Sequence, residues 1–191
     1  NRNKVAGAVG IIAMGFMAAS VMLPVMFWLQ TVQGIPAGEA GIIVAPMALV
    51  SLLMSPVAGI MADKINPRLL GATGFSILIF SLFAAWWVMQ ADALAWVLGL
   101  PTAGLGVGQS FIWGSNAATT LRDVSPQLMG AASGVYNTSR QVGSVLGVAL
   151  VSAVTQTGSP EAAIINSLFA IVVALVVGLV SALCFRNTLQ G

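Results

Sequence analysis

The sequence predicts an all-helical integral membrane protein, built as a bundle of six membrane-spanning helices. Hydrophobic residues make up 58% of the 191 residues and charged residues only 6%, whereas soluble domains are about 25% charged. The mean hydropathy is +0.98. The charged residues are also widely spaced, and the stretches between them hold the ~20 apolar residues that a spanning helix needs. Because lipid offers the backbone no hydrogen-bonding partner, such stretches are expected to fold as helices.

Six spans are predicted in order along the chain. Glycine or proline follows the first and fifth spans, and an N-cap residue before a proline opens the third and the fifth. These punctuating residues are Gly34, Pro36, Gly38, Asn66, Pro67, Ser125, Pro126, Gly158, Ser159 and Pro160. The predicted spans are 6–33, 40–62, 68–90, 94–121, 126–157 and 162–185. Four prolines inside the spans predict kinks: Pro24, Pro46, Pro56 and Pro101.

The distribution of charge predicts the orientation of the bundle. Six spans bring both termini to one side, and that side has all the basic residues outside the spans: Arg2, Lys4, Lys64, Arg68, Arg122 and Arg186. The opposite loops have only the acids Glu39, Asp92 and Glu161. By the positive-inside rule, both termini are predicted to be cytoplasmic in a multi-pass protein of the cell (inner or plasma) membrane. Trp28, Trp86, Trp87 and Trp96 fall near the outer helix ends, as in an interfacial aromatic belt.

Two of the predicted helices have a polar face. In the fourth span the face comprises Gln109, Trp113, Asn116 and Thr120, and in the fifth it comprises Ser133, Asn137, Arg140, Gln141 and Ser144. Polar side chains at membrane depth face a bundle interior or a water-filled cavity. They also join helices by hydrogen bonds. Both interpretations, a pathway and interhelical contact, remain open for these residues.

The first span is rich in methionine, and small residues recur in the fourth and fifth. Met22, Met26 and Gln30 share one stripe of the first helix. Methionine provides a surface that repacks around varied ligands, and it is equally ordinary core filler. Small residues at four-residue spacing permit close helix contact; in the fifth span they are Gly130, Gly134, Ser139, Gly143 and Gly147. GLGVG at 104–108 lies within a span, with no strand before it, so we interpret it as a packing signal and not as a phosphate loop.

The composition argues against several classes of function. There is no histidine, no metal-ligand cluster and no pair of carboxylates inside a span, so the sequence predicts neither an enzyme nor a bound metal or cofactor. Nucleic-acid binding requires a basic stripe along one face, and none is present. The single cysteine, Cys184, is expected to be a small buried hydrophobe.

Three stretches resemble the major facilitator superfamily of transporters. LPVMFWLQTVQGIPAGEAGIIVAP (23–46) is similar to the join between that fold's seventh and eighth helices. GIMADKINPR (59–68) resembles its cytoplasmic loop signature, carried here by Gly59, Asp63, Lys64 and Arg68. GAASGVYNTSRQVGSVLGVAL (130–150) resembles the penultimate helix of the fourteen-helix drug:proton antiporters of the EmrB/QacA type. The match covers only the carboxyl-terminal half of such a transporter. Asn1 in place of Met also favours a chain that begins within a longer polypeptide.

The resemblance implies one half of a major facilitator fold, a 3+3 inverted repeat, that pairs with an amino-terminal half of six to eight helices. The first, second, fourth and fifth helices would line or gate a central cavity, and the third and sixth would face lipid. The family exchanges protons for small lipophilic, often cationic compounds. The site residues implied on that pathway are Arg140, Asn137, Gln141, Ser144, Gln109, Trp113, Asn116, Met22, Met26 and Gln30.

Arg140 is the one charge predicted near mid-membrane, about 21 Å along a helix that starts near Pro126 at ~1.5 Å per residue. Its partner is water, backbone, or an acid of the other half, because no acid of this chain lies inside a span. Arg140 either tunes the pKa of that acid or anchors its helix. For Asp63, a second hypothesis is docking on the amino end of the fifth helix when the cytoplasmic side is closed. The competing functions are an oligomeric channel and a non-transporting scaffold.

Overall fold

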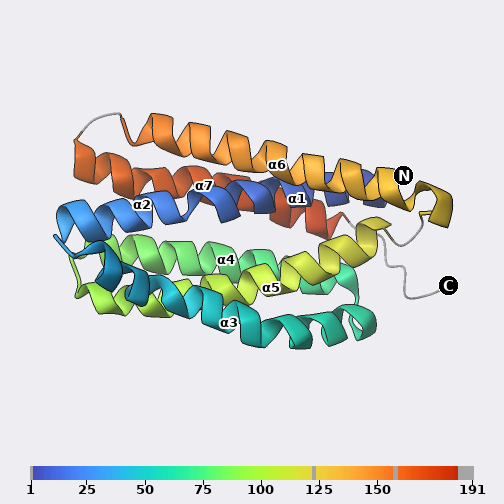
Figure 1. Ribbon diagram of the computed structural model, residues 1–191, viewed down its shortest axis with the longest axis horizontal. Helices are drawn as coiled ribbons and strands as arrows, with labels where there is room; N and C mark the ends of the chain where they lie inside the picture. Colours follow the sequence, from blue (N-terminus) through green and yellow to red (C-terminus); the bar gives the residue numbers. More distant parts are fainter. Residues whose placement is uncertain (1, 122–123, 157–158, 185–191) are drawn as a thin grey trace.

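A computed structural model describes residues 2–121, 124–156 and 159–184, and every regular element within them is helical (Figure 1). The elements are α1 (Arg2–Ser20), α2 (Met22–Phe27), the π-helix η1 (Trp28–Val32), α3 (Ala37–Lys64), α4 (Pro67–Gln90), the 3-10 helix η2 (Ala95–Leu98), α5 (Gly99–Leu121), the 3-10 helix η3 (Pro126–Leu128), α6 (Met129–Val154) and α7 (Pro160–Leu183). The prediction of an all-helical bundle is confirmed.

Five of the described helical segments are long and apolar enough to cross a membrane: Val5–Val32, Ala37–Lys64, Pro67–Gln90, Ala95–Ala117 and Glu161–Leu183. The helix α6 has 26 residues, which is also sufficient to span, but its polar residues lower its hydropathy and it is not among the five. It runs alongside α1 and α7 over their length (Figure 1). Among the six predicted spans, the fifth therefore has the composition that is least typical of a lipid-facing helix.

Local chemistry explains where two helices begin and break. The Asn66 side-chain oxygen accepts a hydrogen bond from the Arg68 amide at 3.0 Å, and Pro67 occupies the first turn of α4, so the predicted N-cap is confirmed. The predicted span 6–33 is not one continuous α-helix, because α1 ends at Ser20 and a π-helix follows α2. Pro24 has no amide hydrogen to donate to the Ser20 carbonyl, which accounts for the break.

The helices pack as two sets of three that are related by an inverted repeat. In Figure 1, α1 starts at the end of the bundle where α7 ends, and α5 starts at the opposite end. The most extensive contacts join α3 with α5, α1 with α6, and α4 with α5, followed by α4 with α7 and α1 with α7. The helices α1, α3 and α4 of the first set correspond in order to α5, α6 and α7 of the second. Under this correspondence, the contact of α3 with α5 matches the contact of α6 with α1. In the same way, the contact of α4 with α5 matches the contact of α7 with α1. The structure therefore shows the predicted 3+3 arrangement.

Glycines bring α1 and α6 into backbone contact. A Cβ atom added to Gly143 would collide with the carbonyl of Ile12, and one added to Gly147 would lie 2.5 Å from the carbonyl oxygen of Phe16. From the other side, a Cβ on Gly15 would collide with the carbonyl of Arg140. By contrast, nothing lies within 4 Å of a Cβ added to Gly134. The small residues of α6 therefore form two groups, one packed against α1 and one open.

The helices α3 and α6 form the two edges of the bundle and are its least buried long helices. The buried residues of α3 are Ala40, Ile43 and Ala58, and those of α6 are Gly143, Gly147 and Val151. The helix α4 buries eleven residues by contrast. Each edge helix is thus packed on one narrow stripe and exposed over most of its circumference.

The prediction that all four tryptophans form an exposed aromatic belt is wrong for Trp28. Its side chain is 0% exposed and lies in the core cluster, because the segment α2–η1 packs against α7. Trp87 and Trp96 are 68% and 51% exposed, as expected for an interface. Trp86 is partly buried and its ring lies 5.5 Å from that of Phe169.

Candidate functional site

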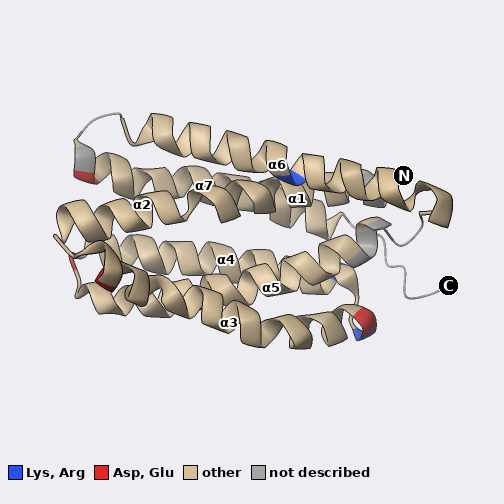
Figure 2. Ribbon diagram, viewed as in Figure 1, with Lys and Arg blue, Asp and Glu red and all other residues tan. Residues whose placement is uncertain are grey.

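Arg140 is the charged residue that the fold places away from both ends of the bundle. Figure 2 shows the other described charges at the two ends, whereas Arg140 appears as the one blue segment midway along α6. It is the twelfth of the 26 residues of α6, so it lies about 17 Å from the start of the helix at ~1.5 Å per residue. Arg140 therefore lies close to the midpoint of α6, and its depth in a membrane stays a prediction.

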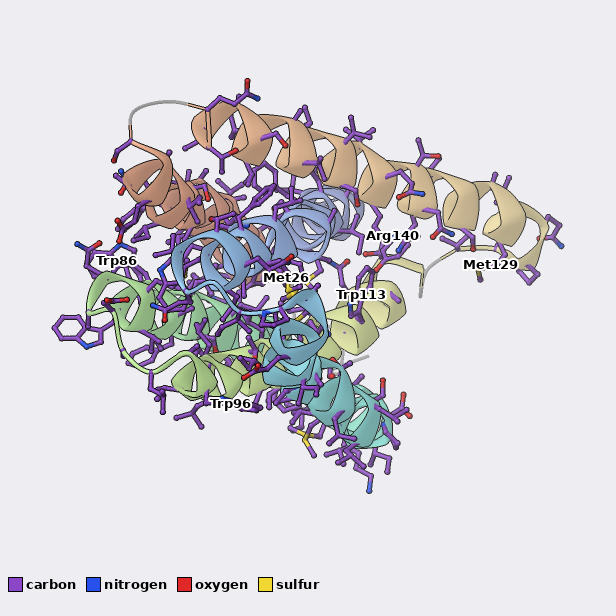
Figure 3. All side chains as sticks on the ribbon, turned by 60° about the vertical axis from the view of Figure 1, so that its left-hand side comes forward. Met26, Trp86, Trp96, Trp113, Met129 and Arg140 are labelled. Carbon is purple, nitrogen blue, oxygen red and sulfur yellow. The ribbon has the colours of Figure 1, made fainter. Side chains whose placement is uncertain are left out.

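The Arg140 side chain leaves α6 and covers the ring of Trp113 on α5. The guanidinium carbon lies 5.6 Å from the ring centroid, and the two side chains point toward each other in Figure 3. A cation–π contact of this kind contributes about 0.5–2 kcal/mol. An arginine at the centre of a membrane helix costs about 3 kcal/mol on insertion scales. The aromatic contact alone therefore falls short, and Arg140 needs a further partner.

For one donor of Arg140, no hydrogen-bond partner is present among the described residues. The Arg140 Nε atom is buried and has no hydrogen-bond acceptor in the described part of the chain. The described acids Glu39, Asp92 and Glu161 lie at the opposite end from Lys64, and Asp63 is next to Lys64 at the end of α3 (Figure 2). The guanidinium therefore retains at least one unused donor at mid-bundle.

Tyr136, which the sequence analysis does not single out, shares this environment. It is the only tyrosine of the chain and lies four residues before Arg140, which places both on one face of α6. Its hydroxyl is buried and has no hydrogen-bond partner in the described residues. The sequence signal that could have identified Tyr136 is a single tyrosine placed one helical turn before Arg140.

The predicted polar face of α5 divides between two different contacts. Gln109 donates from Nε2 to Ser51 Oγ of α3 at 2.5 Å, and Ser51 in turn donates to the Gly106 carbonyl at 3.1 Å. Asn116 is 2% exposed. In the orientation that satisfies both ends of its amide, it donates to the Gly7 carbonyl of α1 at 3.2 Å and accepts from the Ile11 amide at 3.2 Å. Both residues thus hold helices together, and Asn116 is closed off from any cavity.

The remaining predicted residues of α6 also separate. Ser144 Oγ lies 3.2 Å from the carbonyl oxygens of both Gly15 and Arg140, at the crossing with α1. Asn137 is exposed, and its amide donates to the Ser133 carbonyl of its own helix at 3.1 Å. Gln141 is exposed as well. Asn137 and Gln141 are therefore free to contact something outside this bundle, whereas Ser144 is committed to packing.

The methionine stripe of the first span is only partly accessible. Met22 and Met26 are half-buried and pack against the core, while Gln30 is exposed. Met14 and Met17 are 0% exposed, so these two act as core filler. The structure brings Arg140 and Trp113 together, and it leaves Gln30 and Gln141 without a shared contact.

The residues of the loop signature lie in the last turns of α3, from Gly59 to Lys64, and in the first turn of α4, at Arg68. Gly59, Asp63, Lys64 and Arg68 are all exposed. The helices α3 and α6 lie on opposite edges of the bundle (Figures 1 and 3). Asp63 therefore does not dock on α6 in this structure, and the proposed docking stays a prediction for another conformation.

For Asp63→Asn we expect cytoplasmic access to α6 to rise and transport to slow. The substitution removes the charge that would hold α6 in the closed state, at constant side-chain size. Maleimide labelling of a Ser133→Cys probe on a Cys184→Ser background measures the access. Glu39→Gln, an exposed acid at the other end, is the control and should change neither quantity. Unchanged labelling and unchanged transport for Asp63→Asn would leave it as a topological marker only.

The inverted three-helix repeat, its long apolar helices and its two exposed edge helices are those of a partial bundle of a helical membrane protein. Comparison with known proteins agrees, because the family model of the Major Facilitator Superfamily matches residues 2–148. The chain belongs to this superfamily.

Its relatives include transporters with different named activities. The chain is 34% identical over 153 residues to an uncharacterized MFS-type transporter, Rv1250, of Mycobacterium tuberculosis, covering 80% of this chain and 26% of the relative. It is 32% identical to the cephamycin export protein CmcT of Amycolatopsis lactamdurans, over 75% of this chain and 30% of that protein. It is 29% identical to a multidrug resistance protein B homolog of Mycobacterium tuberculosis, over 74% and 26%. The chain thus spans about a quarter to a third of the length of these relatives.

Proposed function

We propose that this chain forms the carboxyl-terminal half of a proton-coupled efflux transporter that exports small lipophilic compounds by alternating access. The observation that carries the proposal is Arg140, a half-buried cation at mid-bundle whose Nε donor has no acceptor within the described chain. Charged side chains within membrane helices are costly, and they typically mark the path of an ion, a proton or a substrate.

The names of relatives support export of drug-like compounds. One relative is named an export protein and another a multidrug resistance protein. Extending these activities to this chain implies a multidrug antiporter whose substrates are lipophilic and often cationic. The proton-carrying acid would belong to the amino-terminal half, because the described acids lie at helix ends.

The partner of this bundle is proposed to be the amino-terminal half of the same transporter, packed on α3 and α6. These two helices bury only three residues each, and a pathway between two halves needs both edges covered. The termini of this segment are proposed to be cytoplasmic, in the cell membrane, with Lys64 and Arg68 on the inner side and Glu39, Asp92 and Glu161 on the outer.

Two other functions receive less support. A channel made of several copies would require a ring of charges or a filter loop, and within the described residues the charge midway along the bundle is a single arginine per chain. A non-transporting scaffold does not explain why a half-buried cation is retained between α5 and α6. Neither alternative accounts for the inverted repeat.

Flux measurements on the full-length protein in proteoliposomes test the proposal. An imposed pH gradient should drive uptake of a lipophilic dye such as ethidium, and collapse of the gradient with nigericin should stop it. Dye movement that is independent of the gradient would contradict proton coupling. Free passage of inorganic ions would instead favour a channel.

The 191-residue chain by itself should not transport. A single half supplies one wall of the pathway, so we expect dye flux from liposomes that contain the monomeric chain to equal that of empty liposomes. Molecular mass in the membrane, measured by single-molecule photobleaching, verifies the monomer. Gradient-driven flux from a verified monomer would show that the pathway lies within this bundle.

A further inference from the structure

We propose that Arg140 and Tyr136 form a carboxylate-binding site in the seam between α5 and α6. The proposal rests on the proposed function only in placing this seam beside the transport pathway. It goes further in naming the chemistry of the missing ligand and in assigning a role to Tyr136.

Both residues present donors that lack an acceptor. Arg140 Nε and the Tyr136 hydroxyl are buried, and neither has a hydrogen-bond partner in the described residues. Two unsatisfied buried donors, one of them charged, call for an acceptor that carries negative charge. The described acids lie at the bundle ends, so this acceptor comes from outside the described chain.

The seam provides the space for such a group. A cavity of about 180 Å³ lies there, lined by residues of three helices that include Ala8 of α1, Thr120 of α5 and Tyr136 and Ser139 of α6. Tyr136 lines this cavity directly, and Arg140 follows it by one helical turn on the same face of α6. Its lining is mostly apolar, which strengthens an ionic contact made inside it.

The contact with Trp113 does not supply the guanidinium with a hydrogen-bond acceptor. The guanidinium carbon lies over the ring, 5.6 Å from its centroid. The N–H donors of a guanidinium lie in its plane and match the two oxygens of a carboxylate. One carboxylate also balances the single positive charge. The tyrosine hydroxyl would then act as a positioning donor to the same group.

The carboxylate has two possible sources, an acidic side chain of the partner half and an acidic substrate. Binding of three pyrene probes to the purified full-length protein distinguishes them: pyrenebutyrate, pyrenebutanol and pyrenebutyl-trimethylammonium. They share one apolar body and differ in the charge of the head group. This experiment measures binding and does not depend on transport. Its outcome is therefore independent of whether the proposed transport function is correct.

If the substrate supplies the carboxylate, pyrenebutyrate should bind at least tenfold more tightly than pyrenebutanol. Tyr136→Phe should reduce that preference about tenfold, the lower end of what a hydrogen bond to a charged group contributes. Arg140→Lys should reduce it further, because an ammonium cannot make the paired contact. Thr138→Val removes a hydroxyl from an exposed position two residues from Tyr136 and should leave the preference unchanged.

If the partner half supplies it, none of the probes should show a carboxylate preference at neutral pH. The same two variants should then shift the pH dependence of trimethylammonium-probe binding toward higher pH, because removing a donor or weakening the cation raises the pKa of the paired acid. Thr138→Val should not shift it. The absence of both effects, with size-exclusion profiles like wild type, would overturn the proposal and leave water as the ligand of these donors.

Discussion

Arg140→Ala is expected to abolish proton-coupled transport by the full-length protein while the protein still inserts in the membrane. Alanine removes the mid-membrane charge and relieves the cost of about 3 kcal/mol that an arginine imposes on insertion, so expression should be maintained. Coupling should be lost because no other described charge lies within the bundle (Figure 2). Gradient-driven dye uptake in proteoliposomes measures the effect, and we expect a loss of at least a hundredfold.

Two further variants make this result specific. Arg140→Lys keeps the charge but not the fork of donors, so transport should recover only in part. Glu161→Gln also changes the net charge by one, at an exposed position in the first turn of α7, and should transport like wild type. Normal gradient-driven uptake by Arg140→Ala would rule out a coupling role and leave Arg140 as an anchor of α6.

Gly143→Val is expected to separate α6 from α1 and prevent stable folding. A Cβ at this position would collide with the Ile12 carbonyl, and a backbone atom cannot move aside as a flexible side chain can. Overpacking of this kind typically costs about 1–3 kcal/mol, and a backbone clash falls at the upper end or above. The fraction of monodisperse protein after detergent extraction and stepwise heating measures the loss.

Gly134→Val is the matched control on the same helix. Nothing lies within 4 Å of a Cβ added at Gly134, so the variant of the 191-residue chain should extract and melt like wild type. Equal stability of the Gly143 and Gly134 variants would show that the close crossing of α1 and α6 does not hold the bundle together.

The sequence could predict the helical bundle because two strong signals coincide. Charge is confined to helix ends by the cost of burying it in lipid, and turn chemistry marks several joins, as the Asn66 N-cap at α4 shows. The depth of Arg140 followed from the helical rise once Pro126 was identified as the start of the fifth span. These features depend on local sequence, so no knowledge of packing was needed.

Features set by contacts between distant helices could not be predicted. Trp28 is buried because α2 and η1 pack on α7, which no local pattern indicates. Asn116 and Gln109 lie on one face of α5 but contact different helices, α1 and α3. The pairing of Arg140 with Trp113 depends on the same packing. The polar faces were visible in the sequence, whereas their division into helix contacts and open donors was not.

Substrate-induced proton release from the purified full-length protein tests most directly whether Arg140 couples substrate to protons. A weakly buffered sample with a pH indicator is titrated with a transported dye, for the wild type and for Arg140→Ala. Our account predicts protons released in proportion to bound substrate by the wild type, and none by the variant at matched occupancy. Equal release from both proteins, or none from the wild type under conditions where it binds and transports the dye, would contradict it.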